Sequence, residues 1–279
     1  MGGAITAANP EDEAHVPKFA ANLTMMFNEV GFLDRFAAAA AAGFAGVEYL
    51  FPYEHDRQQL RQLLDEHRLV QALHNLPAGN WAAGERGIAC HPERTAEFAE
   101  GVNQAIEYAT ALGCTQVNCL AGIVPAGVDA AEARATFVSN VRLAARRLES
   151  AGIKLLIEPI NTRDVPGFFL CRTQQAVEIL KAVASDNLFI QYDVYHMQIM
   201  EGDLAATFER HRPLIAHVQI ADPPARHEPG TGEINFPFLL GRMDSLGYSG
   251  WVGCEYKPAG RTTEGLGWMR SYVESSSVR

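Results

Sequence analysis

Cysteine and positive charge are both scarce in this sequence. Five cysteines occur among 279 residues, and none of them stands in a C-x-x-C spacing. An odd number of scattered cysteines is typical of a reduced, intracellular protein, so we expect a cytoplasmic location. The formal net charge is −10, whereas nucleic acids and anionic membranes attract basic proteins. We therefore expect neither nucleic acid nor a membrane as a partner.

Long apolar runs and targeting signals are also missing. No run approaches the roughly 18 apolar residues of a membrane-spanning helix. The first residues, MGGAITAANPEDEAHVPKF, contain no basic stretch followed by an apolar one, so they do not resemble a secretory signal. We expect residues 1–16 to form a flexible N-terminal extension and residues 17–279 to form one folded domain.

Short apolar runs alternate with longer amphipathic stretches along the rest of the chain. The eight runs occupy residues 18–23, 45–50, 69–75, 115–122, 154–160, 188–193, 215–222 and 250–256. Eight strand-then-helix units in succession predict a single (β/α)8 TIM barrel, which typically takes about 250 residues. An open doubly wound sheet is the alternative, but no G-x-G-x-x-G motif follows the first run.

Polar residues at the ends of the later runs predict a site, because the active site of such a barrel lies at the carboxyl ends of its strands. Glu158, Asp193 and Glu255 belong to three different runs, and three carboxylates in one mouth repel each other unless a cation lies between them. Gln219, on the run between, offers an amide oxygen. Oxygen ligands suit Mg²⁺ or Mn²⁺. Any one of these acids alone is more often a helix cap or an ion-pair partner, so the prediction depends on the set.

Six stretches carry a family resemblance: FAANLTMMFNE, LHNLPAGNWAAGERGIAC, IEPIN, QYDVYHMQ, HVQIADPPARHEPGTGEIN and GCEYKP. They resemble the hydroxypyruvate isomerases of the xylose isomerase-like TIM barrel superfamily, from Pro17 to about Tyr272. ERGIAC and RHEPGTGEIN are the more specific segments, since many sugar isomerases and epimerases share the pattern of four ligands. The resemblance implies a divalent metal ion, Mg²⁺ or Mn²⁺, with these ligands: Glu158, Asp193, Gln219 and Glu255.

The resemblance also implies an activity. It points to an isomerase that interconverts hydroxypyruvate and tartronate semialdehyde by metal-assisted proton transfer through an enediolate. Glu158 and Glu255 are the candidate catalytic residues, because a carboxylate can move the proton between the two carbons. The partner is then a small hydroxy or oxo acid. We expect four residues to contact this substrate: His74, His196, Arg226 and Lys257.

Other functions stay open at this point. An isomerase or epimerase of a longer 2-oxo sugar acid or ketose, such as 2-oxo-tetronate or a tagatose-like sugar, would use the same chemistry with different loops. A metal nuclease needs more histidine ligands and a basic face for phosphates, and the net charge of −10 disfavours it. A binding module without catalysis has no need for two acids placed for proton transfer. The sequence leaves the oligomeric state open, including a homo-oligomer.

Overall fold

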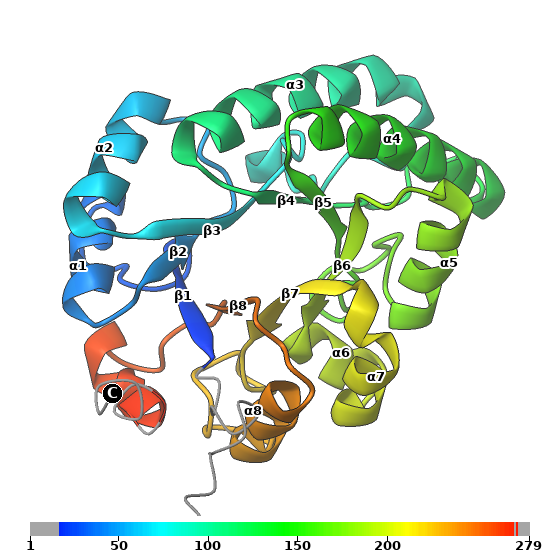
Figure 1. The fold of residues 1–279 in the computed structure, drawn as a ribbon. Helices are drawn as coiled ribbons and strands as arrows, with labels where there is room; N and C mark the ends of the chain where they lie inside the picture. Colours follow the sequence, from blue (N-terminus) through cyan, green and yellow to red (C-terminus); the bar gives the residue numbers. More distant parts are fainter. Residues whose placement is uncertain (1–16, 271, 273–279) are drawn as a thin grey trace, which may run out of the picture.

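Eight parallel strands close into a barrel in sequence order, and helices surround it (Figure 1). The computed structural model describes residues 17–270 and 272, so the predicted extension 1–16 lies outside the described residues. The strands are β1 (Lys18–Asn22), β2 (Gly46–Glu48), β3 (Val70–Asn75), β4 (Gln116–Cys119), β5 (Lys154–Ile157), β6 (Leu188–Asp193), β7 (Ile215–Ile220) and β8 (Trp251–Cys254). Because β8 pairs with β1, the single (β/α)8 barrel is confirmed and the open sheet is excluded.

The helices follow the strands as the alternation predicts, with one addition. They are α1 (Arg35–Ala41), α2 (Arg57–His67), α3 (Thr95–Leu112), α4 (Ala130–Ser150), α5 (Thr173–Val183), α6 (Val194–Met200), α7 (Leu204–His211) and α8 (Phe236–Ser245). The short helix α6, directly after β6, was not predicted. After β8, Thr262–Met269 form a 3-10 helix, and residues 270 and 272 that follow it are α-helical. No helix within residues 17–270 is both long and apolar enough to cross a membrane.

Local signals explain where the helices begin and end. Asp56 caps α2, because its side chain accepts hydrogen bonds from the backbone N–H groups of the first helical turn. Asp129 caps α4 in the same way. Gly113 ends α3 in the left-handed conformation, with φ of 68°, as its place at the end of the amphipathic stretch predicts.

A buried polar network fills part of the barrel interior. The carboxylate of Glu48, on β2, is 1% exposed. It accepts hydrogen bonds from Asn22 Nδ2 at 3.0 Å, Gln219 Nε2 at 2.7 Å and His217 Nε2 at 2.7 Å. Gly253, on β8, leaves the room for this carboxylate, because a Cβ at that position would overlap its oxygens. The interior is therefore filled by matched hydrogen-bonding groups as well as by apolar side chains.

Candidate active site

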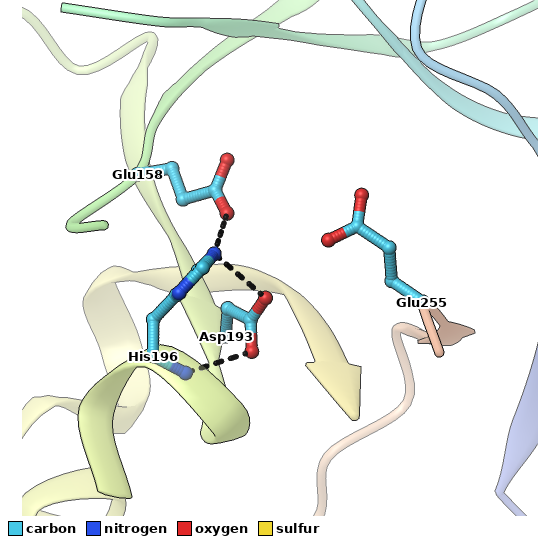
Figure 2. Close-up of side chains that lie close together, drawn as sticks. All are labelled: Glu158, Asp193, His196 and Glu255. Carbon is cyan, nitrogen blue, oxygen red and sulfur yellow. Dashed lines mark hydrogen bonds and ion pairs between the residues drawn. The ribbon is translucent and has the colours of Figure 1, made fainter. Parts of the chain in front are cut away.

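Three carboxylates meet at the carboxyl-terminal mouth of the barrel (Figure 2). Glu158 directly follows β5, Asp193 ends β6, and Glu255 directly follows β8. Together with His196 they form a buried group whose candidate ligand atoms all lie within 4.8 Å of one another. The carboxyl groups of Glu158 and Glu255 face each other across the gap, and Asp193 and His196 lie beside Glu158 (Figure 2). The barrel thus brings acids from three strands into one small volume.

Burial and mutual repulsion make this group unfavourable when it is fully ionised. Burial, with the charges of Glu255 and Asp193, raises the pKa of Glu158 well above its ordinary value. Burial also raises the pKa of Glu255, to about 8, although the nearby Arg226 works in the opposite direction. Asp193 Oδ2 is buried and has no hydrogen-bond partner among residues 17–270. Like charges with an unpartnered oxygen fit a cation, so this group could hold a metal ion.

Arg226 already compensates part of this negative charge. Its Nη2 lies 2.5 Å from Glu255 Oε2 and 3.7 Å from Asp193 Oδ2. Its guanidinium also lies 4.8 Å from the ring centroid of Tyr195. The loop that carries Arg226 is tied together by Asp222, whose carboxylate accepts from three backbone N–H groups further along the loop. Arg226 therefore belongs to the acidic group and is less available to a substrate carboxylate than the sequence suggests.

An asparagine positions Glu158. Asn118 Nδ2 donates to Glu158 Oε2 at 2.8 Å and to Asn75 Oδ1 at 3.1 Å. Glu158 and Asn75 both line a cavity of about 470 Å³ at the mouth. Since Asn118 engages Oε2 only, Oε1 of Glu158 is the oxygen that is directed toward the rest of the group. Asn75 ends β3 and Asn118 lies within β4, and the sequence pattern alone indicates no role for either.

His74 does not lie at this cavity. Side chains alternate along a strand, and it is the next residue, Asn75, that lines the mouth. The His74 ring instead packs against Tyr53, with ring centroids 6.1 Å apart. Neither ring nitrogen has a hydrogen-bond partner in the described chain, and burial lowers the pKa of His74 to about 3. We therefore leave His74 out of the substrate contacts proposed below.

His196 is a neutral hydrogen-bond donor in this arrangement. The backbone N–H of Asp164 donates to Asn161 Oδ1 at 2.7 Å, which fixes the orientation of the Asn161 amide. Asn161 Nδ2 then donates to His196 Nδ1 at 2.6 Å, so the proton of the neutral ring lies on Nε2. Nε2 lies 3.8 Å from Glu158 Oε1 and 3.5 Å from Asp193 Oδ2. Burial lowers the pKa of His196 to about 4, so the ring is uncharged near neutral pH.

The other two predicted residues occupy different surroundings. Gln219 is opposite Asp193 in the register of β6 and β7, and its amide nitrogen donates to Glu48. Its oxygen accepts from Gln191 Nε2 at 2.6 Å, which leaves the second lone pair of that oxygen for another partner. Lys257 is exposed and lines the 470 Å³ cavity together with Arg226.

Four residues of the cavity region were not predicted: Asn161, Asp164, Tyr195 and Arg86. Asn161 and Asp164 orient His196, and Asp164 Oδ2 accepts from the Tyr195 hydroxyl at 2.9 Å. The signal for Asn161 was available, because it follows Glu158 by three residues at the same strand end. Arg86 lies in the loop after β3 and lines the cavity, and its signal in the sequence was the specific ERGIAC segment rather than a strand end.

The fold and the site together define a TIM barrel with a buried acidic mouth that could hold a metal ion. The profile of the xylose isomerase-like TIM barrel family matches residues 36–272, and the chain belongs to this family. A protein named hydroxypyruvate isomerase from Escherichia coli is 53% identical over 255 residues, which are 91% of this chain and 99% of that protein. A protein named 2-oxo-tetronate isomerase from Cupriavidus necator is 52% identical over 258 residues, 92% of this chain and 99% of that protein.

A solved structure supports the same architecture at high similarity. The crystal structure of a Brucella melitensis protein described as AP endonuclease, family 2 matches with a TM-score of 0.90 and 48% sequence identity. The match covers 92% of this chain and 99% of that chain. Similarity of this extent covers most of the barrel.

Proposed function

We propose that this protein is an isomerase that interconverts hydroxypyruvate and tartronate semialdehyde. The observation that carries the proposal is the pair of buried carboxyl groups, Glu158 and Glu255, which face each other across the mouth (Figure 2). A reaction that moves a proton between adjacent carbons needs one group to remove the proton and one to return it. The relatives that are 53% and 52% identical are both named as isomerases of 2-oxo acids.

We infer a divalent metal ion, Mg²⁺ or Mn²⁺, as the cofactor, with the ligands Glu158, Asp193, Gln219 and Glu255. The three acids and the unpartnered Oδ2 of Asp193 support this set. His196 is excluded from it because its Nε2 carries the proton, while a metal ligand requires a free lone pair. When bound, such an ion supplies positive charge that stabilises the oxygen anion developing on the substrate.

Two glutamates and a histidine of this chain would carry out the proton transfer. In hydroxypyruvate the proton to be removed lies on C3, the hydroxymethyl carbon next to the carbonyl. One of the two glutamates, Glu158 or Glu255, removes it, and the bonding electrons move to the carbonyl oxygen to give the enediolate. The other glutamate, in its protonated form, delivers a proton to C2, and the proton of the C3 hydroxyl passes to the C2 oxygen, so that C3 becomes the aldehyde and C2 carries the hydroxyl. The Nε2–H of His196 donates to a substrate oxygen during these steps.

An isomerase of 2-oxo-tetronate or another longer sugar acid is the second candidate. The cavity of about 470 Å³ has room for an acid longer than three carbons. Pockets of roughly 300 to 1,000 Å³ usually bind ligands larger than a three-carbon acid. The relative at 52% identity is named for the four-carbon acid. The chemistry at the two reacting carbons is the same for both substrates.

A metal nuclease is less favoured by the geometry of the mouth. The group found among residues 17–270 contains three acids and one histidine, and that histidine is a hydrogen-bond donor. A nuclease of this architecture needs several metals, further histidine ligands and a basic surface for the phosphates. The net charge of −10 also disfavours binding to phosphates.

The proposed function is tested by proton NMR of the reaction in D₂O. We expect hydroxypyruvate and tartronate semialdehyde to interconvert, with deuterium entering the product carbon. Because the buried acids need a cation, treatment with EDTA should abolish turnover, and Mg²⁺ or Mn²⁺ should restore it. Parallel assays with 2-oxo-tetronate and with ketoses rank the substrates by kcat/KM. Folded, metal-loaded protein that turns over none of these compounds would contradict the proposal.

A further inference from the structure

Arg86 lies on the wall of the catalytic cavity without an acidic partner. It lines the same cavity as Glu158, His196 and Glu255. Its guanidinium stacks 4.1 Å from the ring centroid of Trp81. Its Nη1 donates to two backbone carbonyl groups, Trp81 O at 3.1 Å and Glu85 O at 2.7 Å. Stacking and carbonyl contacts orient this side chain but leave its positive charge uncompensated.

The acid that is adjacent in sequence is engaged elsewhere. One oxygen of the Glu85 carboxylate accepts from Arg94, and the other accepts from the backbone N–H of Asn80. No carboxylate in the described chain forms an ion pair with Arg86. Arg226, in contrast, pairs with Glu255 and lies near Asp193. Of the two arginines that line the cavity, only Arg86 therefore has its charge available to a ligand.

The free part of Arg86 has the shape that a carboxylate needs. Both contacts to backbone carbonyls use Nη1, and nothing among residues 17–270 accepts from Nε or Nη2. These two nitrogens form one edge of the planar guanidinium, and two parallel N–H groups on such an edge match the two oxygens of a carboxylate. The same Nε and Nη2 edge of Arg226 is directed toward Glu255 and so is not free for a ligand.

The loop that carries Arg86 is anchored by backbone hydrogen bonds directly after the residue. The backbone N–H of Gly87 donates to Ala78 O at 3.0 Å, and that of Cys90 donates to Ala121 O at 2.9 Å. Gly87, with φ of 111°, lies so close to the Leu120 carbonyl that no side chain would fit there. Leu120 itself lines the cavity. The guanidinium is thus held in place before a ligand arrives, which lowers the entropic cost of binding.

We propose that Arg86 binds the carboxylate of the substrate through its Nε and Nη2 edge and makes the site selective for 2-oxo acids over neutral ketoses. This inference rests on the proposed isomerase function and gives it a specificity-determining residue. The carboxylate at C1 would lie against Arg86 and Trp81, while C2 and C3 extend toward Glu158 and Glu255. A ketose carries a hydroxymethyl group in place of the carboxylate and gains little from a guanidinium.

The test compares Arg86→Gln and Arg86→Lys with the wild type on two substrates of one size. Hydroxypyruvate carries the carboxylate, and dihydroxyacetone has a hydroxymethyl group in its place. We expect Arg86→Gln to raise KM for hydroxypyruvate about 10- to 100-fold, the effect of losing charged hydrogen bonds. The kcat for hydroxypyruvate and the kinetics with dihydroxyacetone should stay close to wild type. Arg86→Lys keeps the positive charge but loses the two parallel N–H groups of the guanidinium. Its KM for hydroxypyruvate should therefore lie between those of the wild type and Arg86→Gln.

One control variant and one binding measurement complete the test. Arg57→Gln removes an exposed arginine that pairs with Glu107 outside the cavity, and it should leave KM unchanged. Calorimetric titration with D-glycerate, which has a carboxylate but no carbonyl to react, should show weaker binding to Arg86→Gln by the same factor. If the wild type binds glycerate but turns over no 2-oxo acid, the proposed function fails while the carboxylate site stands.

Three results would overturn the role of Arg86. The first is an Arg86→Gln variant with wild-type KM for hydroxypyruvate and wild-type affinity for glycerate. The second is an equal loss with hydroxypyruvate and dihydroxyacetone, which would mean that the variant damages the site in general. The third is a larger rise in KM from Lys257→Gln than from Arg86→Gln, which would assign the carboxylate to the exposed lysine instead.

Discussion

Asp193 divides its two carboxylate oxygens between the backbone and the mouth of the barrel. Oδ1 accepts from the backbone N–H groups of Tyr195 and His196 at 2.8 and 3.2 Å and so caps α6. Oδ2 has no hydrogen-bond partner in the part of the chain that the structure describes. One oxygen of Asp193 therefore acts as a helix cap, and the other, which lies 3.7 Å from Arg226 Nη2, could also bind a cation.

Glu158 provides the sharpest test at the scale of one residue. Glu158→Gln preserves the size of the side chain and one acceptor oxygen for Asn118, but removes its capacity to accept a proton. We expect kcat to fall by about 10² to 10⁴, the usual contribution of a positioned acid–base group. NMR turnover assays measure the loss, and circular dichroism should show an unchanged fold. Near-normal kcat in a folded variant would remove Glu158 from the proton transfer.

At the scale of elements, the junction of β6 and α6 shows why one helix escaped prediction. The stretch that follows Asp193 is VYHMQIM, and a short, mostly apolar run of this kind has no clear helical periodicity. The helix begins there because the Asp193 side chain caps its first turn. This start places His196 within reach of Asn161 and the acidic group. The strand end and the helix start are thus one functional unit.

The close approach of β2 and β8 also makes a prediction about stability. A methyl group at Gly253 would overlap the buried carboxylate of Glu48, so Gly253→Ala should destabilise the protein by about 1–3 kcal/mol, as overpacking does. Gly241 is a matched control, because it lies in α8 with open space around it. There alanine should stabilise by roughly 0.5–1 kcal/mol. Urea unfolding measures both, and equal effects would contradict the overlap.

At the scale of the whole molecule, the acidic group links stability to pH and metal. Burial raises the pKa of Glu158 and raises that of Glu255 to about 8, whereas an unfolded glutamate titrates near about 4.3. The metal-free folded state therefore binds more protons than the unfolded state between these pH values. Stability contributed by these groups is present at low pH and is lost as pH rises through that window.

This linkage predicts a difference between the wild type and Glu255→Gln. Thermal unfolding in EDTA should show that the variant gains stability relative to wild type as pH rises from about 5 toward 8. The comparison is made between variants because the buried His74 and His196, whose pKa values are lowered, act in the opposite sense. Mg²⁺ or Mn²⁺ should raise the wild-type melting temperature more at pH 8 than at pH 5, since protons compete with the metal. Parallel pH profiles would refute this.

The sequence by itself determined the order of the elements, the barrel and the place of its acids. Local periodicity and turn residues specify strands and helices, and parallel strands that close in order must bring their carboxyl ends together. Glu158, Asp193 and Glu255 could therefore be found from their positions alone. Only the tertiary structure decided that Asn75 rather than His74 lines the mouth, and that Arg86 reaches it. Those features depend on contacts between segments that are distant in the sequence. A shift of one residue along a strand moves a side chain to the opposite face of the sheet, and the local sequence pattern does not specify which residue takes which face.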